Sequence, residues 1–216
     1  MMQKKYEACI FDLDGVLVNT AKYHFLAWKR LSEELNIDFT QEDNERLKGV
    51  SRMDSLDIIL GLGNKKLSMD EKMILADKKN NWYRSYIVKM DESEILPGAI
   101  KLLNILKEKG MKIGLGSASK NAPVILNVTG LDEYFDIVID GNSVERAKPD
   151  PEVFLKGAAE LGVDSSRCIV FEDAIAGIQA AKRAGMLAIG VGKKEILNMA
   201  DYVVEDLIDF PIELIY

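Results

Sequence analysis

Cys9-Ile-Phe-Asp-Leu-Asp-Gly-Val-Leu17 decides the fold, because here an apolar run with strand character ends in two aspartates and a glycine. Residues two apart on an extended segment point the same way. The carboxylates of Asp12 and Asp14 can therefore converge as the strand breaks into a turn, at the edge where open α/β sheets bind ligands. They indicate a divalent-metal site in which one oxygen could also attack a substrate. The alternative is a strand that ends in an ordinary polar turn, where Asp and Gly are common.

Further segments carry polar side chains at corresponding places in the chain. An apolar run over 112–116 leads into Ser117, and Lys148 stands just before a proline-opened helix. Another buried-strand run starts at 168 and ends in Glu172 and Asp173, with Gly177 near the start of the next helical stretch. Each segment is a weak signal alone. In this order, however, they form a specific constellation at one edge of a sheet.

Composition excludes several classes of protein. The chain has 216 residues, 48% hydrophobic and 29% charged, which is ordinary for a globular protein of one or two domains. A net charge of −7 argues against a nucleic-acid surface. No apolar run approaches the ~20 residues that span a bilayer, and the N-terminal residues lead into a strand with no signal-peptide pattern. We expect a cytoplasmic protein that binds neither membranes nor nucleic acid.

The metal preference of the chain follows from its residue types. Cys9 and Cys168 both lie in apolar strand runs, so we interpret them as buried hydrophobic residues rather than a disulfide or metal pair. His24 is the only histidine, which nearly excludes a zinc site of nitrogen and sulfur ligands. A site rich in carboxylate oxygens suits Mg²⁺ instead.

Residues 20–93 differ from their surroundings because their patterns are helical. Apolar residues keep helical spacing over 21–36, with Thr20 as a candidate N-cap. A second helix is predicted over 51–60, behind another capping residue, and Ser68-Met-Asp-Glu71 is a capping-box pattern that opens a long helix toward Val88. Because no convincing strand lies in this interval, we expect residues 19–94 to form an inserted helical cap domain.

Strands and helices alternate in the rest of the chain, residues 1–18 and 95–216. This alternation predicts an α/β core with a doubly wound, mainly parallel sheet and helices on both faces. The chain would leave the core near Gly15 to Asn19 and return at Leu96-Pro-Gly98, so these two crossings would form the hinge. Glycine pairs in this region do not complete the Gly-x-Gly-x-x-Gly pattern, which argues against dinucleotide binding. The strands are predicted near 7–12, 112–117, 136–139, 168–172, 187–191 and 202–204, and the helices near 98–109, 121–129, 150–162 and 174–185.

The motifs together resemble those of the haloacid dehalogenase superfamily of phosphotransferases, over essentially the whole chain. The motifs of the superfamily are Asp12-Leu-Asp-Gly15, Ser117, Lys148-Pro149 and Glu172-Asp173. Three other segments are similar to those of the β-phosphoglucomutase family within it. They are Thr20-Ala-Lys-Tyr-His24, Lys48-Gly-Val-Ser-Arg52 and Ser117-Ala-Ser-Lys-Asn121.

The resemblance implies the roles of the core residues. Asp12 would be the nucleophile that forms an aspartyl phosphate, and Asp14 the general acid and base that also lends its backbone carbonyl to the metal. A free Asp titrates near ~3.9, so Asp14 needs a raised pKa, or placement only on closure, to act as an acid near neutrality. Ser117 and Lys148 would hold the transferring phosphoryl group. The Mg²⁺ ligands would be Asp12, Asp14, Glu172 and Asp173.

A second phosphate site is predicted in the helical insert. A glycine loop that runs into a helix N-terminus presents N–H groups to an anion, and Arg52 adds a planar fork suited to phosphate. On these residues alone, the alternative is a capped turn with a solvated arginine. With the resemblance, we expect this segment to clamp the distal, non-reacting phosphate together with a stretch of the core. The residues are Lys48, Gly49, Val50, Ser51 and Arg52 from the insert and Ser119, Lys120 and Asn121 from the core.

His24 and Trp28 lie one helical turn apart, on one face of the first insert helix. Trp28 either packs in a core or forms a wall against a sugar ring. For His24 the resemblance implies a hydrogen bond with Lys79 that couples closure of the cap to the placement of Asp14. The chain departs from the family at Asn19, where an aspartate is expected, and at Ala174, where a serine is common.

The activity implied by the resemblance is the interconversion of β-glucose 1-phosphate and glucose 6-phosphate. It would pass through an aspartyl enzyme and β-glucose 1,6-bisphosphate, in a protein expected to be a monomer. One alternative is a sugar-phosphate phosphatase, in which water attacks the aspartyl phosphate. Another is a non-catalytic sugar-phosphate sensor, which the complete set of catalytic motifs disfavours.

Overall fold

A parallel sheet forms the centre of the protein in the computed structural model, which describes residues 6–47 and 50–215. Its strand order is β3-β2-β1-β4-β5-β6, and every neighbouring pair is parallel. The predicted doubly wound α/β fold is thus confirmed, and each strand lies within its predicted range. The strands are β1 (Ala8–Phe11), β2 (Lys112–Gly116), β3 (Ile137–Ile139), β4 (Cys168–Glu172), β5 (Leu187–Val191) and β6 (Tyr202–Val204).

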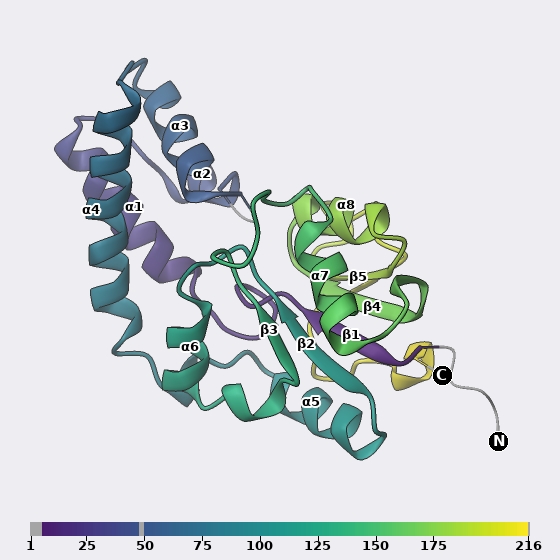
Figure 1. Cartoon of the computed structure of the whole chain (residues 1–216). Coiled ribbons are helices and arrows are strands. Elements are labelled where there is room, and N and C mark those ends of the chain that lie inside the picture. The colour runs from purple at the N-terminus through teal and green to yellow at the C-terminus, as the bar shows by residue number, and fades with distance from the viewer. Residues whose placement is uncertain (1–5, 48–49, 216) are drawn as a thin grey trace.

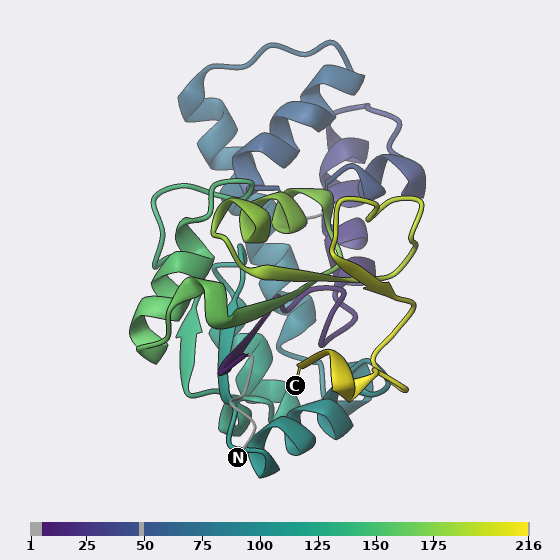
Figure 2. The ribbon, with the colours of Figure 1, turned by 90° about the vertical axis from the view of Figure 1, so that its right-hand side faces the viewer.

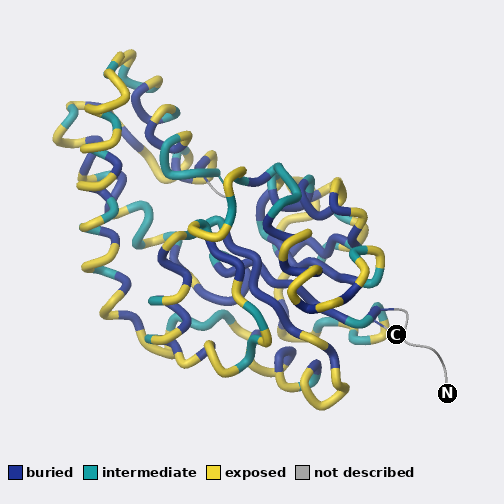
Figure 3. Tube along the Cα trace, viewed as in Figure 1, coloured by how far each residue is buried: buried dark blue, intermediate teal, exposed yellow. Residues whose placement is uncertain are grey.

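Helices cover both faces of the sheet (Figure 1). On β1, Cys9 and Phe11 pack in the apolar cluster that includes α5 (Ala99–Glu108) and α6 (Ala122–Thr129). Ala8 and Ile10 pack in the opposite cluster, with α7 (Glu152–Leu161) and α8 (Ile175–Arg183). Because both faces are covered, the central strands are buried throughout (Figure 3), which explains their continuous apolar runs. Short 3₁₀ helices lie at Glu92–Glu94, Asp132–Tyr134, Ser165–Arg167 and Ile212–Ile215.

Four helices gather at the carboxyl edge of the sheet (Figures 1 and 2). They surround an apolar cluster of their own that includes Trp28, Leu31 and Phe39. In the described part of residues 20–93 there is no strand, as expected. Helix α2 has no counterpart among the predicted helices, although its capping box, in which Thr40 and Asp43 bond reciprocally, was a usable signal. The four are α1 (Ala21–Glu34), α2 (Gln41–Glu45), α3 (Arg52–Leu62) and α4 (Met69–Ile87).

The two crossings between the helices and the sheet run side by side. Val18 and Ile95 form an antiparallel bridge. On either side of it, the Asn19 N–H donates to the Glu94 carbonyl at 2.9 Å. The Leu96 N–H likewise donates to the Leu17 carbonyl at 2.9 Å. The predicted boundaries of the cap fall at this paired connection.

The predicted helix starts have different outcomes. Ser68 accepts a hydrogen bond from the Glu71 N–H and caps α4 as predicted. Ser51, predicted as the first residue of its helix, is instead the N-cap of α3 and accepts from the Asp54 N–H. Thr20 occupies the predicted N-cap position of α1, and its carbonyl accepts from the N–H groups of Tyr23 and His24. Its backbone, however, is helical rather than extended, and its side chain makes no capping hydrogen bond. Its hydroxyl donates to the Asp14 carboxylate instead.

Cys9 and Cys168 are fully buried and unpaired, as interpreted from the sequence. Burial raises the pKa of both thiols, that of Cys168 to about 11. Within residues 6–47 and 50–215, no helix is long and apolar enough to cross a membrane.

Candidate active site

Strand β1 ends in the turn that carries Asp12 and Asp14, beside the end of β4. Gly15 adopts φ of +85°, a left-handed conformation that favours glycine. A Cβ atom on Gly15 would lie 2.2 Å from Oδ2 of Asp173. The missing side chain therefore lets the Asp173 carboxylate approach the turn. Since the Asp12 N–H donates to the Phe171 carbonyl at 2.9 Å, both strand ends are held together.

Lys148 lies between two carboxylates in the buried interior of the site. Its Nζ donates to Oδ1 of Asp12 at 2.5 Å, to Oε1 of Glu172 at 2.7 Å and to the carbonyl of Gly116 at 2.9 Å. Burial alone would lower the pKa of Lys148, but the charges of Asp12 and Glu172 more than offset this, and the pKa is raised. The lysine thus stays positively charged where a phosphoryl group would need neutralisation.

Glu172 is fixed by its neighbours on both oxygens. Oε1 accepts from Lys148, and Oε2 accepts from the N–H of Ala174 at 2.8 Å. A Cβ on Gly177 would lie 1.8 Å from Oε1, so the glycine leaves the space that this carboxylate fills. Burial and the Asp12 charge raise the pKa of Glu172, while Lys148 acts in the opposite direction. Because Ala174 contributes its backbone here, the departure from serine leaves this contact intact.

Asp14 has the raised pKa that an acid near neutrality requires. Burial, followed by the charge of Asp12, raises the pKa of Asp14 to about 6. The hydrogen bond from the Thr20 hydroxyl acts in the opposite direction, because it stabilises the carboxylate. Thr20 was not among the predicted site residues. It immediately follows the β1 turn, so it also links Asp14 to the start of α1.

The loop after β2 carries the predicted serines and Asn121. The hydroxyl of Ser117 accepts from the Ser119 N–H at 3.1 Å, and the hydroxyl of Ser119 accepts from the Asn121 N–H at 3.2 Å. Nδ2 of Asn121 donates to Oδ1 of Asn80 at 3.0 Å, across to helix α4. Asn80, which was not predicted, therefore joins the helical insert to this loop. Lys120 takes part through its carbonyl, which accepts from Nδ2 of Asn142 at 3.1 Å.

His24 and Lys79 form the predicted pair. Nζ of Lys79 lies 3.1 Å from Nδ1 of His24. Burial, with the charges of Lys79 and Arg52, lowers the pKa of His24, so the neutral imidazole can accept this hydrogen bond. Burial likewise lowers the pKa of Lys79 to about 7, and the charge of Arg52 adds to this effect.

Trp28 packs in a core, which is one of the two interpretations of its position, while a contact with a sugar ring stays a prediction. It is 2% exposed and belongs to the apolar cluster of the insert. It also lines the main cavity, and Nζ of Lys79 lies 4.4 Å from the centroid of its ring. Core packing thus fixes the ring at the cavity wall, where it also contacts a cationic side chain.

A cavity of about 1360 Å³ lies between the edge of the sheet and the helical insert. This is large enough for a small organic ligand. Asn19, the other departure from the family, lies on its wall. Lys48 and Gly49 lie outside the described residues. The remaining predicted site residues all line the cavity: Asp12, Asp14, His24, Trp28, Val50, Ser51, Arg52, Ser117, Ser119, Lys120, Asn121, Lys148, Glu172 and Asp173.

Arg52, at the start of α3, is one of the cations that the insert brings to this cavity. Its side chain is 26% exposed, and Nη1 lies 3.7 Å from Oδ1 of Asp77. This long, partly exposed ion pair leaves the guanidinium loosely held. The neighbouring Ser51 hydroxyl is engaged by Asp54, to which it donates at 2.6 Å.

The carboxylates at the sheet edge are the residues that could hold a metal. In the described part of the chain, no three His, Cys, Asp or Glu side chains cluster closely enough to share an ion, and Lys148 bridges Asp12 and Glu172. Asp173 nevertheless lies against Gly15, beside the backbone of the Asp12–Asp14 turn. Carboxylates together with a backbone carbonyl are an oxygen donor set that fits a hard divalent cation. The individual metal ligands stay a prediction.

The sequence model of the haloacid dehalogenase-like hydrolases matches residues 6–185, so the chain belongs to this family, whose chemistry is metal-dependent. Within it, the chain is 45% identical over 212 residues to a β-phosphoglucomutase of Bacillus subtilis. The match covers 97% of this chain and 94% of the relative. The resemblance inferred from the motifs is confirmed.

Two further relatives are named as sugar-phosphate enzymes. The crystal structure of a β-phosphoglucomutase from Clostridium difficile is similar with a TM-score of 0.92 and 46% identity, over 97% of this chain and 95% of that one. A fructose-1-phosphate phosphatase of Escherichia coli is 34% identical, over 88% of this chain and 98% of the relative. The mutases are thus the more similar of these relatives, and a phosphatase shares the family.

Proposed function

We propose that this chain catalyses the β-phosphoglucomutase reaction, the interconversion of β-glucose 1-phosphate and glucose 6-phosphate through β-glucose 1,6-bisphosphate. One observation carries the proposal beyond the similarity to known mutases. A single cavity joins the Asp12–Lys148 cluster to Arg52 and to the Ser119–Asn121 loop. These places supply groups for two phosphates, of which one reacts and the other is held at a distance.

The reacting phosphate would meet Asp12. A carboxylate oxygen of Asp12 attacks phosphorus, the bond from phosphorus to the sugar oxygen breaks, and Asp14 gives that oxygen its proton. Lys148 and Ser117 hold the phosphoryl oxygens during the transfer. Mg²⁺, held by Asp12, Asp14, Glu172 and Asp173, would supply further positive charge that neutralises these oxygens.

Asp14 then acts in the opposite sense on the return step. The aspartyl phosphate passes its phosphoryl group to the free hydroxyl of β-glucose 1-phosphate, and Asp14 takes the proton of that hydroxyl as the bisphosphate forms. The bisphosphate then turns around, so that its other phosphate faces Asp12 and reacts as in the first step, which leaves glucose 6-phosphate. A pKa of about 6 supports both roles, because both protonation states are accessible near neutrality.

The distal phosphate would be held by both parts of the chain. Arg52 with its neighbours Lys48, Gly49, Val50 and Ser51 would contribute from the cap (residues 19–94), and Ser119, Lys120 and Asn121 from the core. His24 with Lys79, and Trp28 against the sugar, would complete the closed site. The contacts between Asn80 and Asn121 and between Thr20 and Asp14 support closure, because each joins the insert to the loops that carry the chemistry.

A sugar-phosphate phosphatase is the second candidate. The 34% identical phosphatase of Escherichia coli favours it, since the same core motifs can pass the phosphoryl group to water. The difference is whether the closed cap excludes water from Asp12. Location in the cytoplasm and a monomeric state stay predictions.

One assay separates the two functions. Pure protein is incubated with β-glucose 1-phosphate, Mg²⁺ and a trace of glucose 1,6-bisphosphate, with the α anomer as control. Glucose 6-phosphate and free phosphate are followed together. We expect glucose 6-phosphate from the β anomer alone and little free phosphate. Free phosphate that matches the loss of substrate would establish the phosphatase and remove the distal clamp from the proposal.

A further inference from the structure

Lys148 is delivered to the site by the loop that joins β3 to α7, residues 140–151. Its side chain is 1% exposed, and its ammonium lies within hydrogen-bond distance of two carboxylates. This placement demands a fixed backbone, because a shift of about 1 Å in a catalytic group can lower a rate by about 100-fold. The loop contains no helix or strand that could hold it. Backbone hydrogen bonds hold Gly141 to Ser119 and Asp150 to Ala147, and side-chain contacts hold the segment between them.

The first end of the loop folds around Asp140, which is buried. Oδ1 of Asp140 accepts from the Asn142 N–H and from the Ser143 hydroxyl, both at 2.9 Å. Nδ2 of Asn142 adds a hydrogen bond to Oδ2 of Asp140 at 2.8 Å. These contacts are local to the turn after β3. They do not reach the residues next to Lys148.

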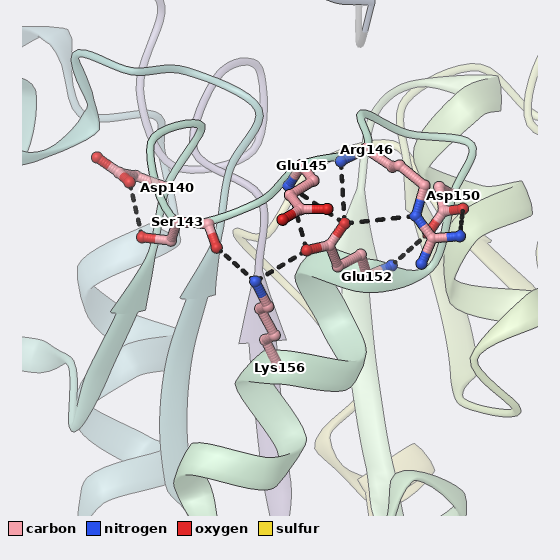
Figure 4. A network of polar contacts seen from close by, with 7 residues as sticks. All are labelled: Asp140, Ser143, Glu145, Arg146, Asp150, Glu152 and Lys156. Carbon is pink, nitrogen blue, oxygen red and sulfur yellow. Dashed lines mark hydrogen bonds and ion pairs between the residues drawn. The ribbon is translucent and has the colours of Figure 1, made fainter.

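Glu152, in the first turn of α7, binds the second part of the loop (Figure 4). Its Oε2 accepts from the N–H of Arg146 at 2.9 Å, and both carboxylate oxygens lie 3.2 Å from the N–H of Glu145. Nζ of Lys156, one turn further along α7, lies 2.8 Å from Oε1 of Glu152 and also donates to the Ser143 carbonyl at 2.7 Å. One carboxylate and one ammonium on α7 thus bind the loop at three residues, Ser143, Glu145 and Arg146.

The surroundings of Glu152 favour the ionised carboxylate that accepts these hydrogen bonds. The hydrogen bonds from Lys156 and from the N–H groups of Glu145 and Arg146 lower the pKa of Glu152 to about 2, so its carboxylate is ionised near neutrality. A carboxylate is also favoured at a helix N-terminus. Glu145, Arg146 and Lys148 line the cavity, whereas Glu152 is not among its described lining residues. Glu152 thus contacts the loop rather than the cavity.

We propose that Glu152 is a positioning residue, which holds residues 143–147 against α7 and thereby fixes the ammonium of Lys148 between Asp12 and Glu172. The inference rests on the proposed function, because it assumes that Lys148 holds the transferring phosphoryl group. Arg146 belongs to the same network, since its Nη1 lies 3.1 Å from Oδ2 of Asp150 and its Nε lies 3.6 Å from Oε2 of Glu152. Glu152 needs no contact with substrate in this role.

The test compares Glu152→Ala and Glu152→Gln with Glu160→Ala, which removes an exposed glutamate from the same helix. Turnover is measured with β-glucose 1-phosphate and, separately, as phosphate release from acetyl phosphate. We expect kcat to fall about 10- to 100-fold in Glu152→Ala, with partial recovery in Glu152→Gln, which keeps one acceptor oxygen. Glu160→Ala should match the wild type.

The same substitution in a protein that lacks Lys148 distinguishes a role in positioning Lys148 from a role in the general stability of the fold. In Lys148→Ala protein, where no ammonium remains to be placed, Glu152→Ala should change the residual rate less than about twofold, because residues that act as a unit are not additive. Backbone amide NMR signals of Ala147 and Lys148 should shift in Glu152→Gln and not in Glu160→Ala. Equal losses in both backgrounds, or unshifted amides in Glu152→Gln, would overturn the proposal.

Failure of the proposed function would be visible separately. Wild-type protein that releases phosphate from both substrates without forming glucose 6-phosphate would not be a mutase. The comparison of Glu152 variants with acetyl phosphate would still report on the placement of Lys148, because phosphatase and mutase share that step. Wild-type rates in Glu152→Ala with acetyl phosphate would refute the positioning role alone.

Discussion

At the scale of single residues, Asp12 is the position on which the chemistry depends. Asp12→Asn should abolish turnover, since an amide cannot serve as the nucleophile for phosphorus. The fold should persist, because Lys148 keeps Glu172 as an ion-pair partner. The check is a progress curve with β-glucose 1-phosphate, together with a circular dichroism spectrum. Appreciable residual turnover in a folded variant would remove the aspartyl phosphate from the mechanism.

A side chain at Gly177 should collide with the buried Glu172 carboxylate. An added Cβ would lie 1.8 Å from Oε1 of the buried Glu172, so Gly177→Ala should displace this carboxylate and destabilise the fold by about 1–3 kcal/mol. Gly61 is a matched control in helix α3, because its Cβ would meet nothing within 4 Å. Gly61→Ala should stabilise by up to about 1 kcal/mol through its better helix propensity. Urea unfolding curves measure both, and equal effects would contradict the crowding at Gly177.

At the scale of the elements, α1 and α4 together bury a lysine. Lys79 is 3% exposed, and its pKa is lowered to about 7 by burial and by Arg52. Between pH 7 and 10.5 the unfolded chain therefore binds a proton that the folded protein lacks, so stability rises with pH over this window. Below pH 7 both states are charged and the full cost of burial remains.

Replacement of Lys79 by an apolar residue should remove its contribution to the pH dependence of the free energy of unfolding. We expect Lys79→Met to be more stable than the wild type below pH 7, and its advantage to shrink by about 1.4 kcal/mol for each pH unit from 7 to 10. Lys78→Met, at a neighbouring exposed lysine, is the control. The free energy of unfolding is measured at pH 6 and pH 9. A difference that stays constant across this range would show that Lys79 is protonated throughout.

The start of α3 carries the distal phosphate in the proposed function. Arg52→Ala should weaken the binding of the distal phosphate by roughly 1.5–3 kcal/mol, as expected for a charge-assisted hydrogen bond. Phosphoryl transfer from acetyl phosphate, which has no second phosphate, should be spared. Titration with glucose 1,6-bisphosphate and the acetyl phosphate rate are compared. An equal fall in both would mean that Arg52 does not act on the distal phosphate.

At the scale of the whole molecule, the strands and most helices could be predicted, because each depends on a local pattern. Buried strands such as Cys168–Glu172 appear in the sequence as nearly continuous apolar runs. The capping box of Ser68 and Glu71 indicates the start of a helix. The acidic, serine and lysine motifs could be placed at one edge because parallel strands share their direction. Local patterns and family motifs were sufficient for these features.

Contacts between distant segments could not be predicted in the same way. Thr20 lies at the predicted N-cap position of α1, but its hydroxyl donates to the Asp14 carboxylate and does not cap the helix. The hydrogen bond between Asn80 and Asn121 joins residues 41 positions apart, and neither side chain has a local pattern that signals it. Packing between segments decides these contacts. The short helix α2 is different, because it lacks the length over which periodicity becomes visible and its local signal is the capping box of Thr40 and Asp43.

The paired crossings of the chain have a consequence for how this architecture can change. Since Val18 and Ile95 are bridge partners, the two ends of the insert meet at one point on the sheet. An insertion whose ends meet imposes no strain on its host, so a different insert, or a short turn, could occupy this place while the strands kept their register. The α/β core can thus keep the residues for phosphoryl transfer while the helical insert changes in the substrates that it recognises. New specificities could thus arise by grafting one segment.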